Sequence, residues 1–133
     1  MPKPKILIIE DDRFLLKIYS DRLRREGFDV IGSITGIEGL SKAQSENPDV
    51  IILDIVLPGK NGFEVLSDLK LDQNTKNIPV IILSNLGQDS DVKKGLKLGA
   101  VTYLIKTEFP VSQLPGIIKK QLVKKEENRS VVK

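Results

Sequence analysis

Five short apolar runs alternate along the chain with segments whose apolar residues recur every three or four positions. The first pattern is typical of strands buried on both faces, and the second of amphipathic helices. Strands and helices in alternation form a parallel sheet, because each right-handed crossover lays its helix on one face of the sheet. The predicted strands span residues 6–9, 30–34, 50–53, 80–83 and 101–105.

The sequence therefore predicts a three-layer, doubly wound α/β fold. Its 133 residues, 40% of them hydrophobic, suffice for one buried core. We expect one domain over residues 1–125 and a frayed tail, or the start of a linker, over residues 126–133. The last helix, expected over residues 111–125, has two possible starts. With Ser112 as N-cap, Pro115 falls in the first turn, and with a start at Pro110 the helix would be kinked.

Composition excludes several classes of function. The chain contains no cysteine, so it has neither disulfides nor thiolate sites, and no histidine, so it has no serine-histidine triad or histidine base. No apolar run approaches the roughly 20 residues that span a bilayer. We expect a soluble, cytoplasmic protein. A net charge of +3, with basic residues gathered only around residues 119–125, predicts neither nucleic acid nor membrane as a partner.

Acidic residues follow two of the predicted strands. Glu10, Asp11 and Asp12 come after the first strand, and Asp54 comes after the third. Parallel sheets bind ligands at the carboxyl ends of their strands, where the strand order reverses; in the order 2-1-3-4-5, that point lies between the first and third strands. Clustered carboxylates there would hold a proton or a hard cation such as Mg²⁺. A single acidic residue could simply be a helix cap, which is how we interpret Asp12.

Two further polar residues end the remaining strands on the same edge. Ser84 follows the fourth strand, and Lys106 follows the fifth. A carboxylate beside a metal can accept a phosphoryl group if the phosphoryl oxygens are neutralised during transfer. Magnesium, the Lys106 ammonium and the Ser84 hydroxyl could each contact one of those oxygens. These positions make Asp54 the candidate phosphoryl acceptor.

With these residues, the chain from about residue 5 to residue 125 resembles the receiver domains of response regulators in two-component signalling. The resemblance implies a flavodoxin-like fold with strand order 2-1-3-4-5. It also implies phosphorylation of Asp54 by a separate histidine kinase or phosphotransfer protein, because the chain has no histidine of its own. The motifs that carry it are Glu10-Asp11, Asp54-Ile55-Val56-Leu57-Pro58, Asn61-Gly62, Ser84 and Tyr103-Leu104-Ile105-Lys106.

The resemblance also implies roles for individual residues. Asp11, Asp54 and the Val56 carbonyl would ligate Mg²⁺, with Glu10 acting mainly through water. Ser84 and Tyr103 would form a switch pair that alters the surface of residues 90–98, 101–105 and 111–125. That surface would serve an unknown output partner, a missing effector domain or a homodimer. The chain would be no enzyme beyond transferring a phosphoryl group to itself and losing it again.

Four positions depart from the family pattern. Thr107 follows Lys106, where the family usually has a proline in a cis peptide, and Asn85 follows Ser84, where a small residue is usual. Val56 and Leu86 are both apolar and cannot orient a hydrolytic water, so we expect slow loss of the phosphoryl group. Val56 also stands where a phosphatase of the haloacid dehalogenase type needs a second aspartate. A receiver-like interaction module that is never phosphorylated remains the alternative.

Overall fold

The computed structural model describes residues 2–131, with side chains as far as residue 128. Five parallel strands form one sheet in the order β2-β1-β3-β4-β5, as predicted. Its strands are β1 (Lys5–Ile9), β2 (Asp29–Ser33), β3 (Val50–Leu53), β4 (Val80–Ser84) and β5 (Thr102–Ile105). The α-helices are α1 (Arg13–Arg25), α2 (Gly36–Glu46), α3 (Gly62–Leu71), α4 (Asp89–Lys97) and α5 (Leu114–Val131), and the 3₁₀ helices are η1 (Lys106–Glu108) and η2 (Val111–Gln113).

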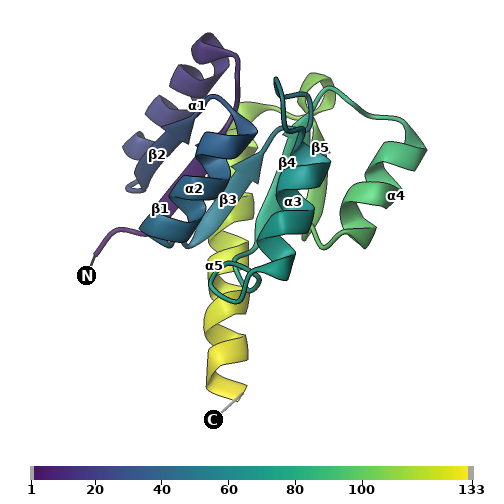
Figure 1. Ribbon diagram of the computed structural model, residues 1–133. Helices are drawn as coiled ribbons and strands as arrows, with labels where there is room; N and C mark the ends of the chain where they lie inside the picture. The colour runs from purple at the N-terminus through teal and green to yellow at the C-terminus, as the bar shows by residue number, and fades with distance from the viewer. Residues whose placement is uncertain (1, 132–133) are drawn as a thin grey trace.

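Helices cover the sheet on both sides, which gives three layers (Figure 1). Alternate residues of each central strand enter different cores. Leu7 and Ile9 pack with α2 and α3, whereas Ile6 and Ile8 pack with α1 and α5. The side chains of β1, β3 and β4 are therefore almost wholly buried. This two-sided burial explains why these strands read as continuous apolar runs.

The segment between β5 and α5 differs from a simple strand-to-helix turn. The Lys106–Thr107 peptide is trans, and residues 106–108 form η1. α5 begins at Leu114, which places Pro115 in the first turn, where its missing N–H costs no helical hydrogen bond. α5 continues to Val131, past the expected end at Lys125, and projects from the body of the domain (Figure 1).

Side-chain caps fix where the helices begin beside the carboxyl edge of the sheet. The Asp12 carboxylate accepts hydrogen bonds from the N–H groups of Phe14 and Leu15, so its prediction as a cap is confirmed. Asn61 and Glu64 form a reciprocal capping box at the start of α3. Because each cap removes an unsatisfied N–H, it sets the length of the loop that precedes the helix.

Among the helices of residues 2–131, none combines the length and the apolar character needed to cross a bilayer.

Gly62 lets α3 start directly against the strand end that carries Asp54. A Cβ at this position would lie 2.3 Å from the Asp54 carbonyl oxygen and 2.6 Å from the Ile55 Cα, both backbone atoms that cannot move aside. A Cβ on Gly116, inside α5, would meet nothing within 4 Å. We expect Gly62→Ala to lower the free energy of unfolding by about 1–3 kcal/mol.

The matched change Gly116→Ala should instead raise the free energy of unfolding by about 0.5–1 kcal/mol, because alanine is more favourable than glycine inside a helix. Urea unfolding of the two variants measures both values. Equal effects of the two substitutions would contradict the close contact between Gly62 and the backbone of Asp54 and Ile55.

Candidate functional site

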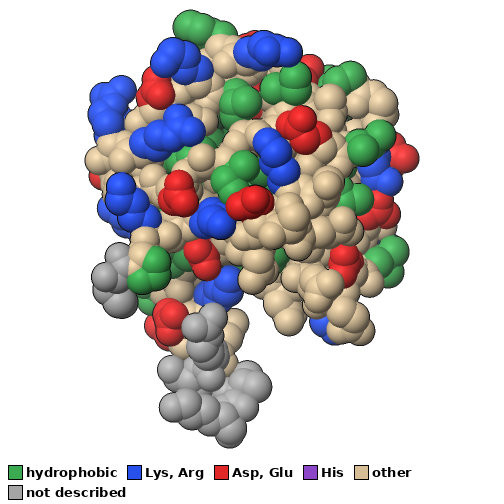
Figure 2. Space-filling view, turned by 60° about the vertical axis from the view of Figure 1, so that its left-hand side comes forward, with side chains coloured by type: hydrophobic (Ala, Val, Ile, Leu, Met, Phe, Trp, Pro, Cys, Tyr) green, Lys and Arg blue, Asp and Glu red, His purple; other side chains and the backbone are tan. Residues whose placement is uncertain are grey.

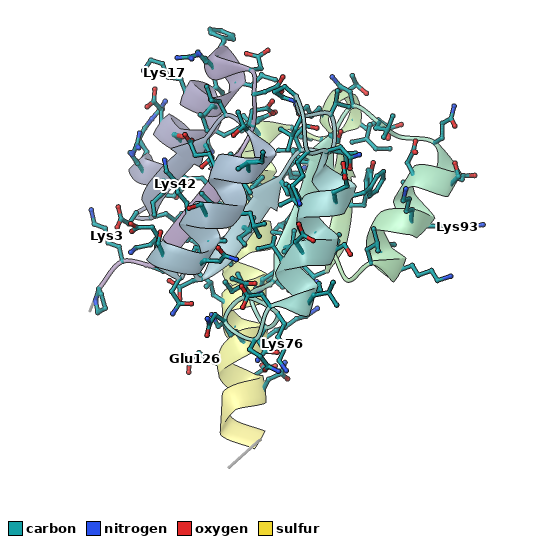
Figure 3. The ribbon with its side chains drawn as sticks, viewed as in Figure 1. Lys3, Lys17, Lys42, Lys76, Lys93 and Glu126 are labelled. Atoms are coloured by element: carbon teal, nitrogen blue, oxygen red, sulfur yellow. The ribbon has the colours of Figure 1, made fainter. Side chains whose placement is uncertain are left out.

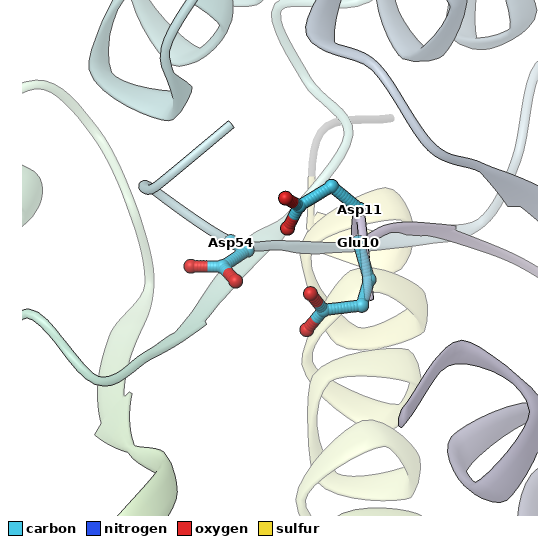
Figure 4. A group of neighbouring side chains, drawn as sticks. All are labelled: Glu10, Asp11 and Asp54. Carbon is cyan, nitrogen blue, oxygen red and sulfur yellow. The ribbon is translucent and has the colours of Figure 1, made fainter. Parts of the chain in front are cut away.

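Three carboxylates converge at the carboxyl edge of the sheet, as the sequence predicted. Glu10 and Asp11 follow β1, and Asp54 follows the neighbouring strand β3. One carboxylate oxygen from each of the three lies within 4.8 Å of the others (Figure 4). Glu10 and Asp54 are buried, whereas Asp11 is exposed. The cluster is therefore open to solvent from the Asp11 side.

Lys106, at the end of β5, bridges two of these carboxylates. Its Nζ lies 2.7 Å from Asp54 Oδ2 and 2.5 Å from Glu10 Oε1. The Lys106 side chain is only 10% exposed, and those of Glu10 and Asp54 are 3% and 5% exposed. Charges removed from water to this extent are stable only when they are paired and hydrogen-bonded. The ammonium group thus holds the ends of β1, β3 and β5 together.

Burial and neighbouring charges shift the acid-base properties of this group. Burial raises the pKa of Glu10 to about 7, with a further contribution from the Asp54 charge, although hydrogen bonds from Lys106 and the Asp12 N–H oppose the shift. Burial pulls the pKa of Lys106 down, but hydrogen bonds to Asp54 and Glu10 outweigh it, so the Lys106 pKa lies above its ordinary value. Lys106 is therefore cationic near neutral pH.

The donor set fits a hard divalent cation. All three side chains offer carboxylate oxygens, which Mg²⁺ prefers, and one of them faces solvent. Three ionised carboxylates and one ammonium would carry a net charge of −2, which one divalent ion neutralises. The second oxygen of Asp54, Oδ1, accepts a hydrogen bond from the Val56 N–H at 3.2 Å, which orients the carboxylate.

Ser84 and Tyr103 both contact the backbone of Leu86. The Leu86 N–H donates to Ser84 Oγ at 3.3 Å, and the Tyr103 hydroxyl donates to the Leu86 carbonyl. Ser84 is fully buried, and burial raises the pKa of Tyr103 to about 12, so Tyr103 remains a hydrogen-bond donor. One residue of the β4–α4 loop thus connects the two predicted switch residues.

The remaining predicted positions lie around this cluster. Val56 is 58% exposed, Asn85 is exposed and Leu86 is half-buried. The sequence did not predict the Lys106–Glu10 contact. It also did not predict that the Leu86 backbone contacts both Ser84 and Tyr103. No local signal in the sequence could have revealed them, because each depends on loop conformation after the strand ends. Despite Thr107, Lys106 reaches Asp54.

The raised pKa of Glu10 makes stability depend on pH. Between the ordinary value of 4.5 and about 7, the folded chain holds a proton on Glu10 that the unfolded chain releases. Stability falls with pH wherever the folded state binds more protons. In metal-free buffer, the unfolding free energy of the wild type relative to Glu10→Gln should fall across this range, by on the order of 2 kcal/mol, and level off above it.

Urea unfolding of both chains at several pH values measures this difference. Groups elsewhere contribute equally to both chains and cancel. A difference that stays constant, or rises with pH, would contradict the assigned burial of Glu10.

Comparison with known proteins places this geometry in a family. Residues 6–119 match the family model of the response regulator receiver domain. The DNA-binding dual master transcriptional regulator RpaA of Synechocystis sp. is 42% identical over 111 residues, which are 84% of this chain and 46% of RpaA. Protein PilH of Pseudomonas aeruginosa is 37% identical over 102 residues, which are 77% of this chain and 84% of PilH.

Solved structures agree with the sequence relatives. The crystal structure of a CheY-like response regulator receiver domain protein from Methanospirillum hungatei matches with a TM-score of 0.88 and 27% identity, covering 95% of this chain and 98% of that one. The Francisella response regulator 1452 receiver domain matches with a TM-score of 0.85 and 29% identity, covering 92% and 99%. This chain spans about half the length of RpaA. It belongs to the response regulator receiver domain family.

Proposed function

We propose that this chain is a phosphorylation-controlled switch of two-component signalling, with Asp54 as the phosphoryl acceptor. The observation that carries the proposal is the Lys106 ammonium, 2.7 Å from Asp54 Oδ2 within a cluster of three carboxylates. This arrangement offers a nucleophile, a fixed positive charge and oxygen ligands for a cation at one point. Phosphoryl transfer to a carboxylate needs these three elements.

In the proposed reaction, an Asp54 carboxylate oxygen attacks the phosphorus of a phosphohistidine on a separate kinase or phosphotransfer protein. The O–P bond forms as the N–P bond breaks, and the electron pair of that bond returns to the imidazole, which leaves with the donor protein. Lys106 then lies close enough to donate a hydrogen bond to a phosphoryl oxygen, and the Ser84 hydroxyl can donate to another. Asp54 is held for attack by the Val56 N–H.

The metal in this proposal is Mg²⁺, which would supply positive charge against the phosphoryl oxygens when bound. Asp11 and Asp54 would bind the ion directly, and Glu10 would act mainly through water. The Val56 carbonyl would be a further protein ligand. The spacing of the Glu10, Asp11 and Asp54 oxygens supports this assignment.

Ser84 and Tyr103 would carry the signal away from the site. Ser84 Oγ accepts from the Leu86 N–H, so its own O–H remains available to a phosphoryl group. Movement of Ser84 would shift the Leu86 peptide and hence the acceptor of the Tyr103 hydroxyl. The Tyr103 ring also packs against α4, where the absence of a side chain at Gly95 lets the ring lie close to the helix. A phosphoryl group could thus alter the α4-β5-α5 surface.

The proposal extends to the setting of the protein. A histidine kinase or phosphotransfer protein would be the donor, and the output would be a further effector domain, a separate partner or a homodimer through α4-β5-α5. The relatives named as transcriptional regulators are longer than this chain, which is consistent with an attached effector domain. We propose that this reaction takes place in the cytoplasm. Beyond self-phosphotransfer and autodephosphorylation, we propose no enzymatic activity.

Phosphorylation of Asp54 can be tested directly. Incubated with acetyl phosphate and Mg²⁺, the chain should gain one phosphoryl group in its intact mass, and Asp54→Asn should gain none. Asp12→Asn is the matched control, because Asp12 caps α1 and should not be needed for transfer. Chelation of the metal should prevent the gain. A wild-type chain that stays unmodified would favour the unphosphorylated interaction module.

The lifetime of the phosphoryl group tests the roles of Val56 and Leu86. Neither side chain can bind a water molecule beside the acyl phosphate. Replacing Val56 with Asn and Leu86 with Glu should therefore speed phosphate release about tenfold, as one well-placed hydrogen bond to the attacking water would. Phosphate release is timed after removal of acetyl phosphate. An unchanged rate in the double variant would show that these positions do not limit hydrolysis.

A further inference from the structure

The β3–α3 loop, residues 54–61, carries part of the proposed metal site between the end of β3 and the start of α3. Asp54 begins the loop, and the Val56 carbonyl, a proposed Mg²⁺ ligand, follows two residues later. Magnesium demands near-ideal octahedral geometry with short metal–oxygen distances. Whatever fixes the course of this loop therefore decides how well the site fits Mg²⁺.

Hydrogen bonds hold the two ends of the loop, whereas much of its middle lies at the surface. The Gly62 N–H donates to the Ile55 carbonyl at 2.9 Å, and Asn61 caps α3. Between these ends, Val56 is 58% exposed, and residues 58–59 are also exposed. The middle of the loop is therefore the part that can shift most easily.

Gly36, the first residue of α2, lies against the middle of this loop. A Cβ on Gly36 would clash with the Lys60 carbonyl oxygen and would lie 2.8 Å from Val65 Cγ2. Gly36 is buried, and its φ lies outside the left-handed region, so its backbone conformation is open to alanine. The close approach to Lys60, and not the backbone conformation, requires glycine at this position.

The helix that carries Gly36 is itself fixed in position. Thr35 caps its first turn by accepting a hydrogen bond from the Glu38 N–H at 3.1 Å. Lys42, farther along α2, donates to the Gly32 carbonyl of β2 at 2.7 Å, which ties the helix to the edge of the sheet (Figure 3). α2 is therefore the firm side of the contact, and the β3–α3 loop is the side that would yield.

We propose that Gly36 is a positioning residue of the metal site and sets its preference for Mg²⁺ over Ca²⁺. Because Gly36 has no side chain, α2 lies directly against the Lys60 carbonyl and supports the loop that carries the Val56 carbonyl. Ca²⁺ accepts longer and less regular coordination than Mg²⁺, so its binding depends less on this support. The inference rests on the proposed function, because it names a residue that tunes the same metal site.

A glycine-to-alanine change at this position alters geometry without altering charge. Acidic and basic side chains are interspersed over the side of the molecule that carries α2, and the substitution leaves all of them in place (Figure 2). A change in metal affinity would then come from the position of the ligands. Gly36→Ala is therefore a specific probe of the support.

Calorimetric titration of the full chain with MgCl₂ and with CaCl₂ tests the proposal. Gly36→Ala should weaken Mg²⁺ binding about tenfold, as expected when a residue that orients ligands is changed, and Ca²⁺ binding by less than about threefold. Gly39→Ala, on the same helix, is the matched control, because the atoms nearest to its Cβ belong to the Ile9 side chain and not to the loop. It should leave both affinities unchanged.

Two outcomes of these titrations would overturn the proposal. One is unchanged Mg²⁺ binding in Gly36→Ala. The other is an equal loss of affinity for Mg²⁺ and Ca²⁺, which would indicate a general loss of structure rather than a change in ligand spacing.

Phosphorylation by acetyl phosphate supplies a second readout. In Gly36→Ala, the Mg²⁺ concentration that gives half-maximal phosphorylation should rise about tenfold, in step with the loss of affinity. The rate at saturating Mg²⁺ should stay close to that of the wild type, because Lys106 still contacts Asp54. A lower rate at saturation with an unchanged half-maximal concentration would contradict a role in metal positioning.

The wild-type chain provides a test that needs no folded variant. Saturation with Mg²⁺ should shift the amide NMR signals of Gly36 and Lys60, because these residues meet where α2 supports the loop. The signal of Gly39, which faces Ile9, should shift less. Signals of Gly36 and Lys60 that move no more than that of Gly39 would overturn the proposal.

Together, these measurements separate the inference from the proposed function. If the wild type binds Mg²⁺ and Asp54 is phosphorylated, but Gly36→Ala binds Mg²⁺ equally well, the role of Gly36 is wrong and the switch stands. If Gly36→Ala loses Mg²⁺ selectively but Asp54 of the wild type stays unmodified, the support stands and the phosphoryl-acceptor function is wrong. A wild type that binds no Mg²⁺ would overturn both.

Discussion

The Lys106 ammonium is the interaction on which the rest of the site depends. It joins Glu10 and Asp54, two buried carboxylates from neighbouring strands, and comes itself from the edge strand β5. Without this charge, the two carboxylates would repel each other across a short distance in a poorly solvated place. With it, they can lie close enough to Asp11 to share a cation. In the proposed reaction, the same ammonium would face the incoming phosphoryl group.

The fold supplies this arrangement through simple constraints. Parallel strands bring their carboxyl ends to one edge, and two-sided burial keeps β1, β3 and β4 rigid beneath the site. The Asp12 cap starts α1 only three residues after β1, so the loop that carries Glu10 and Asp11 is short, and the capping box of Asn61 fixes where α3 begins. Because Gly62 has no side chain, the start of α3 can lie against the Asp54 backbone. Stability and site geometry therefore rest on the same residues.

Much of this could be predicted from the sequence because its signals are local or periodic. Apolar runs located the strands, and the polar residues that end them identified Glu10, Asp11, Asp54, Ser84 and Lys106. Contacts set by loop conformation could not be predicted. The Lys106–Glu10 contact depends on the path of the chain after β5, where a trans Thr107 leads into η1. The end of α5 at Val131 was also missed, because a charged, polar sequence fits a solvated helix and a frayed tail equally well.

The proposed metal site requires that the three carboxylates share one divalent cation. Substitution of Mn²⁺ for Mg²⁺ tests it most directly, because a paramagnetic ion broadens the amide signals of residues around it. We expect saturable binding of one ion, with loss of the signals of Glu10, Asp11, Asp54 and Val56 while those of β2 remain. Binding that does not saturate, or broadening centred on another part of the chain, would contradict it.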